Sequence, residues 1–151
     1  MRRWVVIAAA LLLGACAFTT TTSVSELTVD DPRIGAPAGE NAALYLTVRS
    51  SIEDRLIEAR TDVAVRVELH ETVHGDDGTM GMRQVEAFTV SPGQDLILEP
   101  GGAHIMLLDV EELTVGELVP VTLVFEEAGE IEVPAEVVDL ADTMGEDHAD
   151  H

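Results

Sequence analysis

Strict alternation of apolar and polar residues is the feature that most constrains the fold of this chain. Residues 63–70 alternate without a break, and residues 119–125 place Val, Val, Leu and Phe at every second position. A period of two is typical of a β-strand with one face turned to a core. In the first run the face expected to be buried carries Val63, Val65, Val67 and Leu69, and His70 belongs to the opposite face.

The rest of the chain continues this pattern in short segments separated by glycine- and proline-bearing turns. Several short strands at intervals of about 8–12 residues are typical of a β-sandwich or small barrel. At 151 residues the chain is expected to form a single all-β domain with appendages. Residues 52–60 fit either a helical turn or a strand. The other expected strands are 43–49, 63–70, 85–90, 95–98, 104–109, 118–126 and 131–138.

The net charge of −21 excludes two classes of partner. Nucleic acids and anionic membrane surfaces both select basic patches, so neither is expected to bind. The acidic residues are spread along the chain, which is typical of a solvated surface. A secondary effect of the negative field would be to concentrate cations near the protein.

The N-terminus has the composition of a secretory signal. Arg2 and Arg3 precede an apolar run over residues 4–13, which is too short for a stable membrane span. The segment Leu13-Gly14-Ala15-Cys16 resembles the lipobox of bacterial lipoproteins, which implies cleavage before Cys16 and lipid attachment to its thiol. The alternative is ordinary secretion with an incidental Cys16.

Four segments are therefore expected. They are a signal peptide over 1–15, a lipidated cysteine and flexible tether over 16–26, a folded domain over 27–140, and an acidic Met/His-bearing flexible tail over 141–151.

The cysteine count limits the chemistry of the domain. Because Cys16 is the only cysteine, the domain is expected to have no disulfide and no thiolate for a blue-copper electron-transfer site.

Soft metal donors are few and lie together in the second half of the chain. His70 ends an expected strand, and His104 and Met106 share a face of another. Met80 and Met82 share a side if their segment is extended. Alone, a histidine at a strand end is usually a surface residue and a methionine usually fills a core. Together, imidazole and thioether donors favour Cu(I) over Mg, Ca or Mn.

The surroundings of these donors resemble the periplasmic Cu(A) copper chaperone family. Residues 68–71 read Glu-Leu-His-Glu, Met82 is followed by arginine, and residues 98–107 read Leu-Glu-Pro-Gly-Gly-Ala-His-Ile-Met-Leu. The family's spacing between Met82 and the His104-x-Met106 pair is kept, and the resemblance covers residues 27–138. It implies a cupredoxin-like Greek-key β-sandwich that binds one Cu(I) through His70, Met82, His104 and Met106.

One departure from the family pattern leaves the ligand set open. Eleven residues separate His70 from Met82, where the family usually has ten. The turn at residues 75–78 could absorb the extra residue, but Met80 and His74 stay as competing ligands. The C-terminal tail resembles the Met/His-rich extensions of some members. It is interpreted either as an inert acidic end or as a further copper site that could bind Cu(II). Its donors are Met144, His148 and His151.

The resemblance implies a copper chaperone that exchanges ligands and is not an enzyme. The predicted protein is extracytoplasmic and monomeric, and is held to the membrane only by its lipid. The implied acceptor is the binuclear copper centre of cytochrome c oxidase, through an oxidase subunit or another copper chaperone. The alternative is a β-sandwich lipoprotein that binds a protein partner and carries an incidental His/Met cluster. No nucleophile elbow, His-Glu-x-x-His motif or phosphate-binding loop supports catalysis.

Overall fold

The computed structural model describes residues 26–143, and within them the chain forms ten β-strands and one four-residue helix. The prediction of an all-β chain is confirmed. The strands are β1 (Leu27–Ala38), β2 (Asn41–Ser50), β3 (Asp54–Arg60), β4 (Ala64–His74), β5 (Met80–Gln84), β6 (Phe88–Val90), β7 (Leu96–Leu98), β8 (Ala103–Val110), β9 (Leu118–Phe125) and β10 (Gly129–Val138), and the helix is α1 (Leu140–Thr143).

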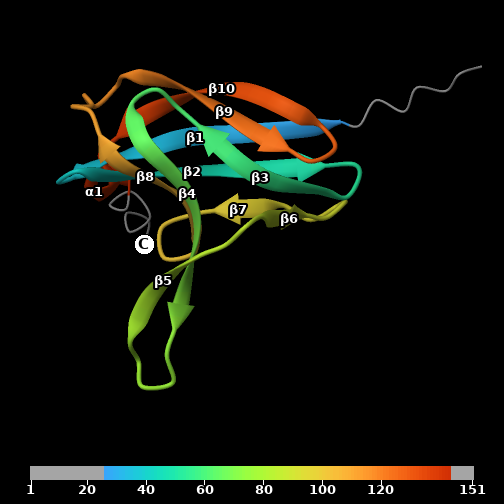
Figure 1. Ribbon diagram of the computed structural model, residues 1–151, viewed down its shortest axis with the longest axis horizontal. Helices are drawn as coiled ribbons and strands as arrows, with labels where there is room; N and C mark the ends of the chain where they lie inside the picture. The colour runs from blue at the N-terminus through green and yellow to red at the C-terminus, as the bar shows by residue number, and fades with distance from the viewer. Residues whose placement is uncertain (1–25, 144–151) are drawn as a thin grey trace, which may run out of the picture.

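The ten strands join in one hydrogen-bonded order that curls into a nearly closed barrel. The order is β5-β4-β8-β7-β2-β1-β10-β9-β3-β6, and β8 also pairs with β2. β1 is parallel to β10, whereas β4 is antiparallel to both β5 and β8. Strands far apart in sequence, such as β4 and β8, therefore lie side by side (Figure 1).

The core is built from the alternating side chains that the sequence pattern singled out. In β9 the four apolar residues at alternate positions of residues 119–125 are each 2% exposed or less. Burial of such side chains contributes about 1.5–3 kcal/mol each relative to full exposure. Because aromatic residues are scarce, aliphatic side chains do most of this packing. The largest fully buried side chains are Phe125, Ile34, Leu44, Leu56, Leu98, Ile105, Leu107, Leu123, Val48, Val90, Val119 and Val121.

A buried carboxylate closes the turn between β9 and β10. Asp54, 2% exposed, accepts hydrogen bonds from the backbone N–H groups of Arg55 at 2.7 Å, Glu127 at 2.9 Å and Ala128 at 3.0 Å. The amides of Glu127 and Ala128 lie in the turn outside the strand ladders and need an acceptor. Alternation did not predict burial of Asp54, because these two partners are 73 and 74 residues away.

A hairpin projects from the barrel, as Figure 1 shows. We call residues 71–84, the end of β4 with β5, the hairpin arm, and the other described strands with residues 64–70 the body. All five residues of β5 are exposed. The arm therefore holds its shape mainly through the β4–β5 ladder and contributes little to the core.

Three strand predictions need comment. Residues 52–60 contain strand β3, and a bulge between Leu56 and Glu58 explains the helix-like spacing of buried Leu56 and Ala59. A strand over 85–90 is wrong at 85–87, because the chain there crosses from β5 at one end of the strand order to β6 at the other. Val65 is 75% exposed, so the predicted burial of that face is wrong at Val65, whereas Leu69 is buried and Val63 and Val67 are half-buried against the core.

The predicted signal peptide and Cys16 lie outside the described residues, as does nearly all of the tether. Most of the predicted tail, including Met144, His148 and His151, lies outside them as well. The segment boundaries stay predictions. Within residues 26–143 no helix has the length and apolar character needed to cross a membrane.

Candidate metal centre

Two histidines face each other across neighbouring strands of the body. His70 on β4 is the direct cross-strand partner of His104 on β8. Their ring centroids are 5.7 Å apart, with an angle of 63° between the ring planes. His104 is only 6% exposed and the His70 side chain 15%, so both imidazoles are largely shielded from water. The fold thus brings together two donors that are 34 residues apart in sequence.

Met106 lies on the same face of the sheet as the two imidazoles. It follows His104 by two residues on β8, and its cross-strand partners are Glu68 on β4 and Ala43 on β2. Ile105 and Leu107, between and beyond these donors, point into the core and are fully buried. Alternation along β8 therefore keeps the donors on one face and the packing residues on the other.

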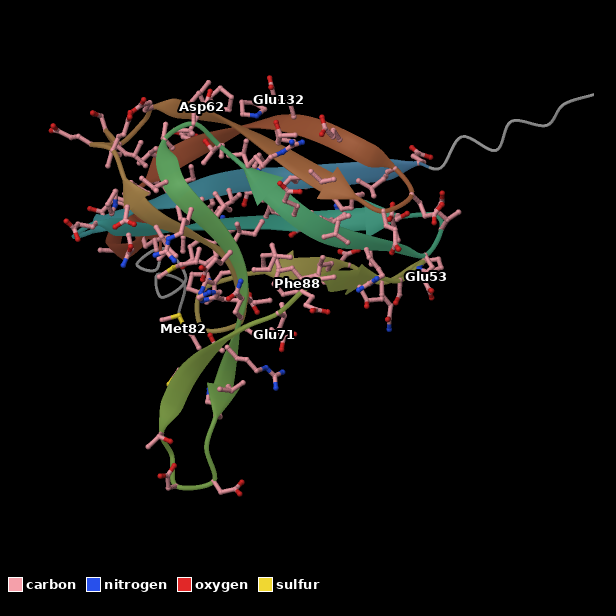
Figure 2. All side chains as sticks on the ribbon, viewed as in Figure 1. Glu53, Asp62, Glu71, Met82, Phe88 and Glu132 are labelled. Carbon is pink, nitrogen blue, oxygen red and sulfur yellow. The ribbon has the colours of Figure 1, made fainter. Side chains whose placement is uncertain are left out.

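The fourth predicted ligand comes from the hairpin arm. Met82 on β5 is the cross-strand partner of Thr72, which shares its face with His70. The side chain of Met82 is 61% exposed, and Figure 2 shows it near the root of the arm. Thr72 fixes this root to the body, because its N–H and its hydroxyl both donate to the carbonyl of Gly102, at 3.2 Å and 2.9 Å.

A hollow of about 330 Å³ opens over three of these donors, His104, Met106 and Met82, and His70 is not part of its lining. Burial raises the pKa of the Tyr45 phenol on its floor, and the charge of Arg33 opposes that shift. The phenol is therefore neutral at physiological pH and adds no anion to the hollow. The lining is mostly apolar with thioether and imidazole groups: Ala43, Tyr45, Thr72, Met80, Gly81, Met82, Gly101, His104 and Met106.

The hydrogen bonds of the two imidazoles leave one lone pair on each ring. His70 Nε2 lies 2.8 Å from a Glu68 carboxylate oxygen, and His104 Nδ1 lies 3.2 Å from the Gly102 carbonyl oxygen. Both partners are acceptors, so these ring nitrogens carry the protons. The lone pairs are then on Nδ1 of His70 and Nε2 of His104. His70 Nδ1 is buried and has no hydrogen-bond partner among the described residues.

An orphaned buried nitrogen is unfavourable in an empty fold and fits a site that receives a metal. The Glu68 contact has the form of the carboxylate–histidine pair that orients metal-binding imidazoles. Sequence reasoning missed Glu68, although its position two residues before His70 on the same strand face was a usable signal. Gly101, the first of two glycines before His104, has a φ of +81° in the turn that presents the Gly102 carbonyl.

The competing donors His74 and Met80 lie farther out on the arm. They are direct cross-strand partners of each other, two residues beyond the Thr72–Met82 pair on the same face of the ladder. At about 3.3 Å per residue, the backbone of His74 is about 13 Å along β4 from that of His70. The register therefore favours Met82 over Met80 as the companion of His70. The extra residue between His70 and Met82 is accommodated with Met82 still on the ligand face.

Residues 26–143 contain no group of three or more His, Cys, Asp or Glu side chains that could hold a metal ion. The soft donors that line the hollow are the His104 imidazole and the thioethers of Met80, Met82 and Met106. The four-residue ligand set stays a prediction whose donors the fold brings to one face of three adjacent strands.

A known protein family matches most of the chain. Residues 27–137 match the family described as "Putative lipoprotein LpqE-like". "Putative lipoprotein Lxx21020" of Leifsonia xyli subsp. xyli (strain CTCB07) is 31% identical over 87 residues, which are 57% of this chain. The match covers 52% of that protein, about half of its length.

Solved structures of similar fold include copper-binding domains. The copper-bound PCuAC domain from PmoF2 is 28% identical, with a TM-score of 0.63 over 75% of this chain and 92% of that one. The solution structure of CuI-DR1885 from Deinococcus radiodurans is 27% identical, with a TM-score of 0.58 over 82% and 83% of the two chains. The predicted resemblance in sequence and fold to the Cu(A) chaperone family is confirmed.

Proposed function

Because this chain belongs to the LpqE-like lipoprotein family and shares the PCuAC fold, we propose that it is an extracytoplasmic Cu(I) chaperone. The proposed ligands are His70, Met82, His104 and Met106. The observation that carries the proposal is the His70–His104 pair, in which two shielded imidazoles face each other with unspent lone pairs beside two thioethers. The copper-bound state of the PmoF2 domain supports the same cargo here.

The donor set favours the lower oxidation state of copper. Two imidazoles and two thioethers are neutral and include soft sulfur donors, which suit Cu(I). Cu(II) prefers harder nitrogen and oxygen ligands in a square-planar arrangement, and the described residues offer no such cluster. We assign Cu(II) binding, if the protein has it, to the donors of the tail.

The partition of the site between body and arm suits transfer. His104 and Met106 are on a core strand, whereas Met82 is 61% exposed on the arm. An acceptor with thiolate ligands can displace Met82 first, because that donor is accessible and is released without disturbing the core. Glu68 then keeps His70 oriented while the ion leaves. The acceptor we propose is the binuclear copper centre of cytochrome c oxidase or another copper chaperone.

Lipid attachment at Cys16 would hold the chaperone at the membrane that carries such an oxidase. We place the protein in the periplasm or on the outer face of the cell membrane. The lipoprotein description of the family and of the Leifsonia relative supports this location.

The test is a Cu(I) titration against a chromophoric Cu(I) competitor, using the full chain with Cys16→Ser so that no thiol contributes. We expect one tight equivalent that is lost in a Met82→Leu, Met106→Leu double variant. The matched control is Met80→Leu, which removes an equally exposed thioether two residues farther out and should keep the tight equivalent. Binding that ignores the double substitution would contradict the ligand set and favour a lipoprotein whose His/Met cluster is incidental.

A further inference from the structure

The outer end of the hairpin arm carries a second pair of soft donors that the proposed site does not use. His74 and Met80 are direct cross-strand partners in the β4–β5 ladder. Side chains so placed have Cβ atoms about 4.5–5.5 Å apart. That separation lets an imidazole nitrogen and a thioether sulfur converge on one ion.

Neither residue serves the core. Met80 is 64% exposed, and His74 is exposed as well. Met80 instead lines the same hollow as Met82, His104 and Met106. Soft donors therefore follow one another from the body outward along a single face of the arm.

The outer His74–Met80 pair and the inner His70–His104 pair are too far apart to bind a single ion together. Successive cross-strand pairs on one face are two residues, or about 7 Å, apart along the strand. His74 is four residues beyond His70, so its backbone is about 13 Å from the inner imidazoles. A metal–nitrogen or metal–sulfur bond is about 2.0–2.3 Å long. An ion held at His70 and His104 is therefore out of reach of the His74 ring.

The electrostatic setting of the outer pair favours a cation. The turn between the two strands carries Asp76 and Asp77, and the pKa of Asp77 is lowered because Thr79 donates hydrogen bonds to its carboxylate. The tip of the arm is therefore anionic at neutral pH. These carboxylates follow His74 and precede Met80 in sequence, and their negative charge favours a cation near this pair.

We propose that His74 and Met80 form a second, outer Cu(I) site that passes copper to and from the inner site. Cu(I) accepts a low coordination number, so one imidazole and one thioether suffice to hold it weakly. Transfer inward then needs only exchange of one thioether for the next, from Met80 to Met82, along the face that both share. This inference rests on the proposed function for its inner site.

The experiment uses the full chain with methionine methyl groups labelled with ¹³C. Cys16→Ser removes the thiol, and Met144→Leu, His148→Asn and His151→Asn remove the donors of the tail. Cu(I) is added anaerobically while the methyl resonances are followed. We expect the first equivalent to shift the Met82 and Met106 methyls and the second to shift the Met80 methyl.

His74→Asn should abolish the Met80 response and leave those of Met82 and Met106 in place. The matched control is Val73→Thr, on the other face of the same strand, which should leave all three responses. The outer site is overturned if Met80 shifts with the first equivalent, if it does not shift with the second, or if it responds equally without His74. Failure of Met82 and Met106 to respond would instead overturn the proposed inner site. The Met80 signal tests the outer site independently of that result.

Discussion

The body and the hairpin arm use the same kind of strand for opposite purposes. In the body, β9 alternates between fully buried and half-exposed or exposed residues, and its apolar face closes the core. In the arm, every residue of β5 is exposed, and its two methionines face a hollow that opens to solvent. Regular strand pairing therefore provides stability in one region and displays metal donors in the other. The proposed copper site lies across their boundary.

The largest expected effect is on the stability of the body. Asp54→Ala leaves backbone N–H groups near Glu127 and Ala128 without their acceptor, so we expect a loss of about 3 kcal/mol in the free energy of unfolding. The measurement is urea denaturation. Glu53→Ala, an exposed carboxylate at the neighbouring position (Figure 2), is the control and should change little. A comparable loss in Met80→Leu would break the division between body and arm.

The next effect concerns the boundary itself. Glu68→Leu removes the acceptor of the His70 Nε2 proton and should weaken Cu(I) binding about 10–100-fold, the usual cost of losing such a partner. Glu68→Gln keeps an acceptor oxygen and should restore most of the affinity. The affinity is measured by competition, and ¹⁵N spectra of His70 report the tautomer. Unchanged affinity together with an unchanged tautomer in Glu68→Leu would show that Glu68 does not position His70.

The smallest effect is confined to the arm and depends on pH. The pKa of Asp77 is lowered chiefly by the hydrogen bond from the Thr79 hydroxyl, so its folded value lies below its unfolded one. The contribution of this contact is present at neutral pH and is lost as the pH falls through the folded pKa. We expect lower amide protection factors in the arm at acidic pH, taken relative to the intrinsic exchange rate at that pH, and Asp77→Ala should remove this effect. An equal loss of protection in β9 would place the acid response in the body.

The sequence predicts the fold class and the donors because both depend on local patterns. Alternation over residues 119–125 specifies a half-buried strand, and the order of His70, Met82, His104 and Met106 carries the family resemblance. The pairing of His70 with His104 could not be predicted from the sequence, because it depends on β4 lying beside β8. Burial of Val65 was wrong for the same reason, since alternation identifies a face but not the length over which the body covers it.

The exposed tip of the arm sets a rule for how this chain can change in length. A residue added within either strand of the hairpin reverses the side chains beyond it, so Met82 would turn from the hollow to the opposite face. A residue added in the turn at Gly75–Gly78 leaves the Thr72–Met82 pairing as it is. An insertion in this hairpin is thus expected either to leave the ligand positions unchanged or to remove Met82 from the ligand face. Distant relatives are better aligned by which residues pair across the ladder than by counting residues between ligands.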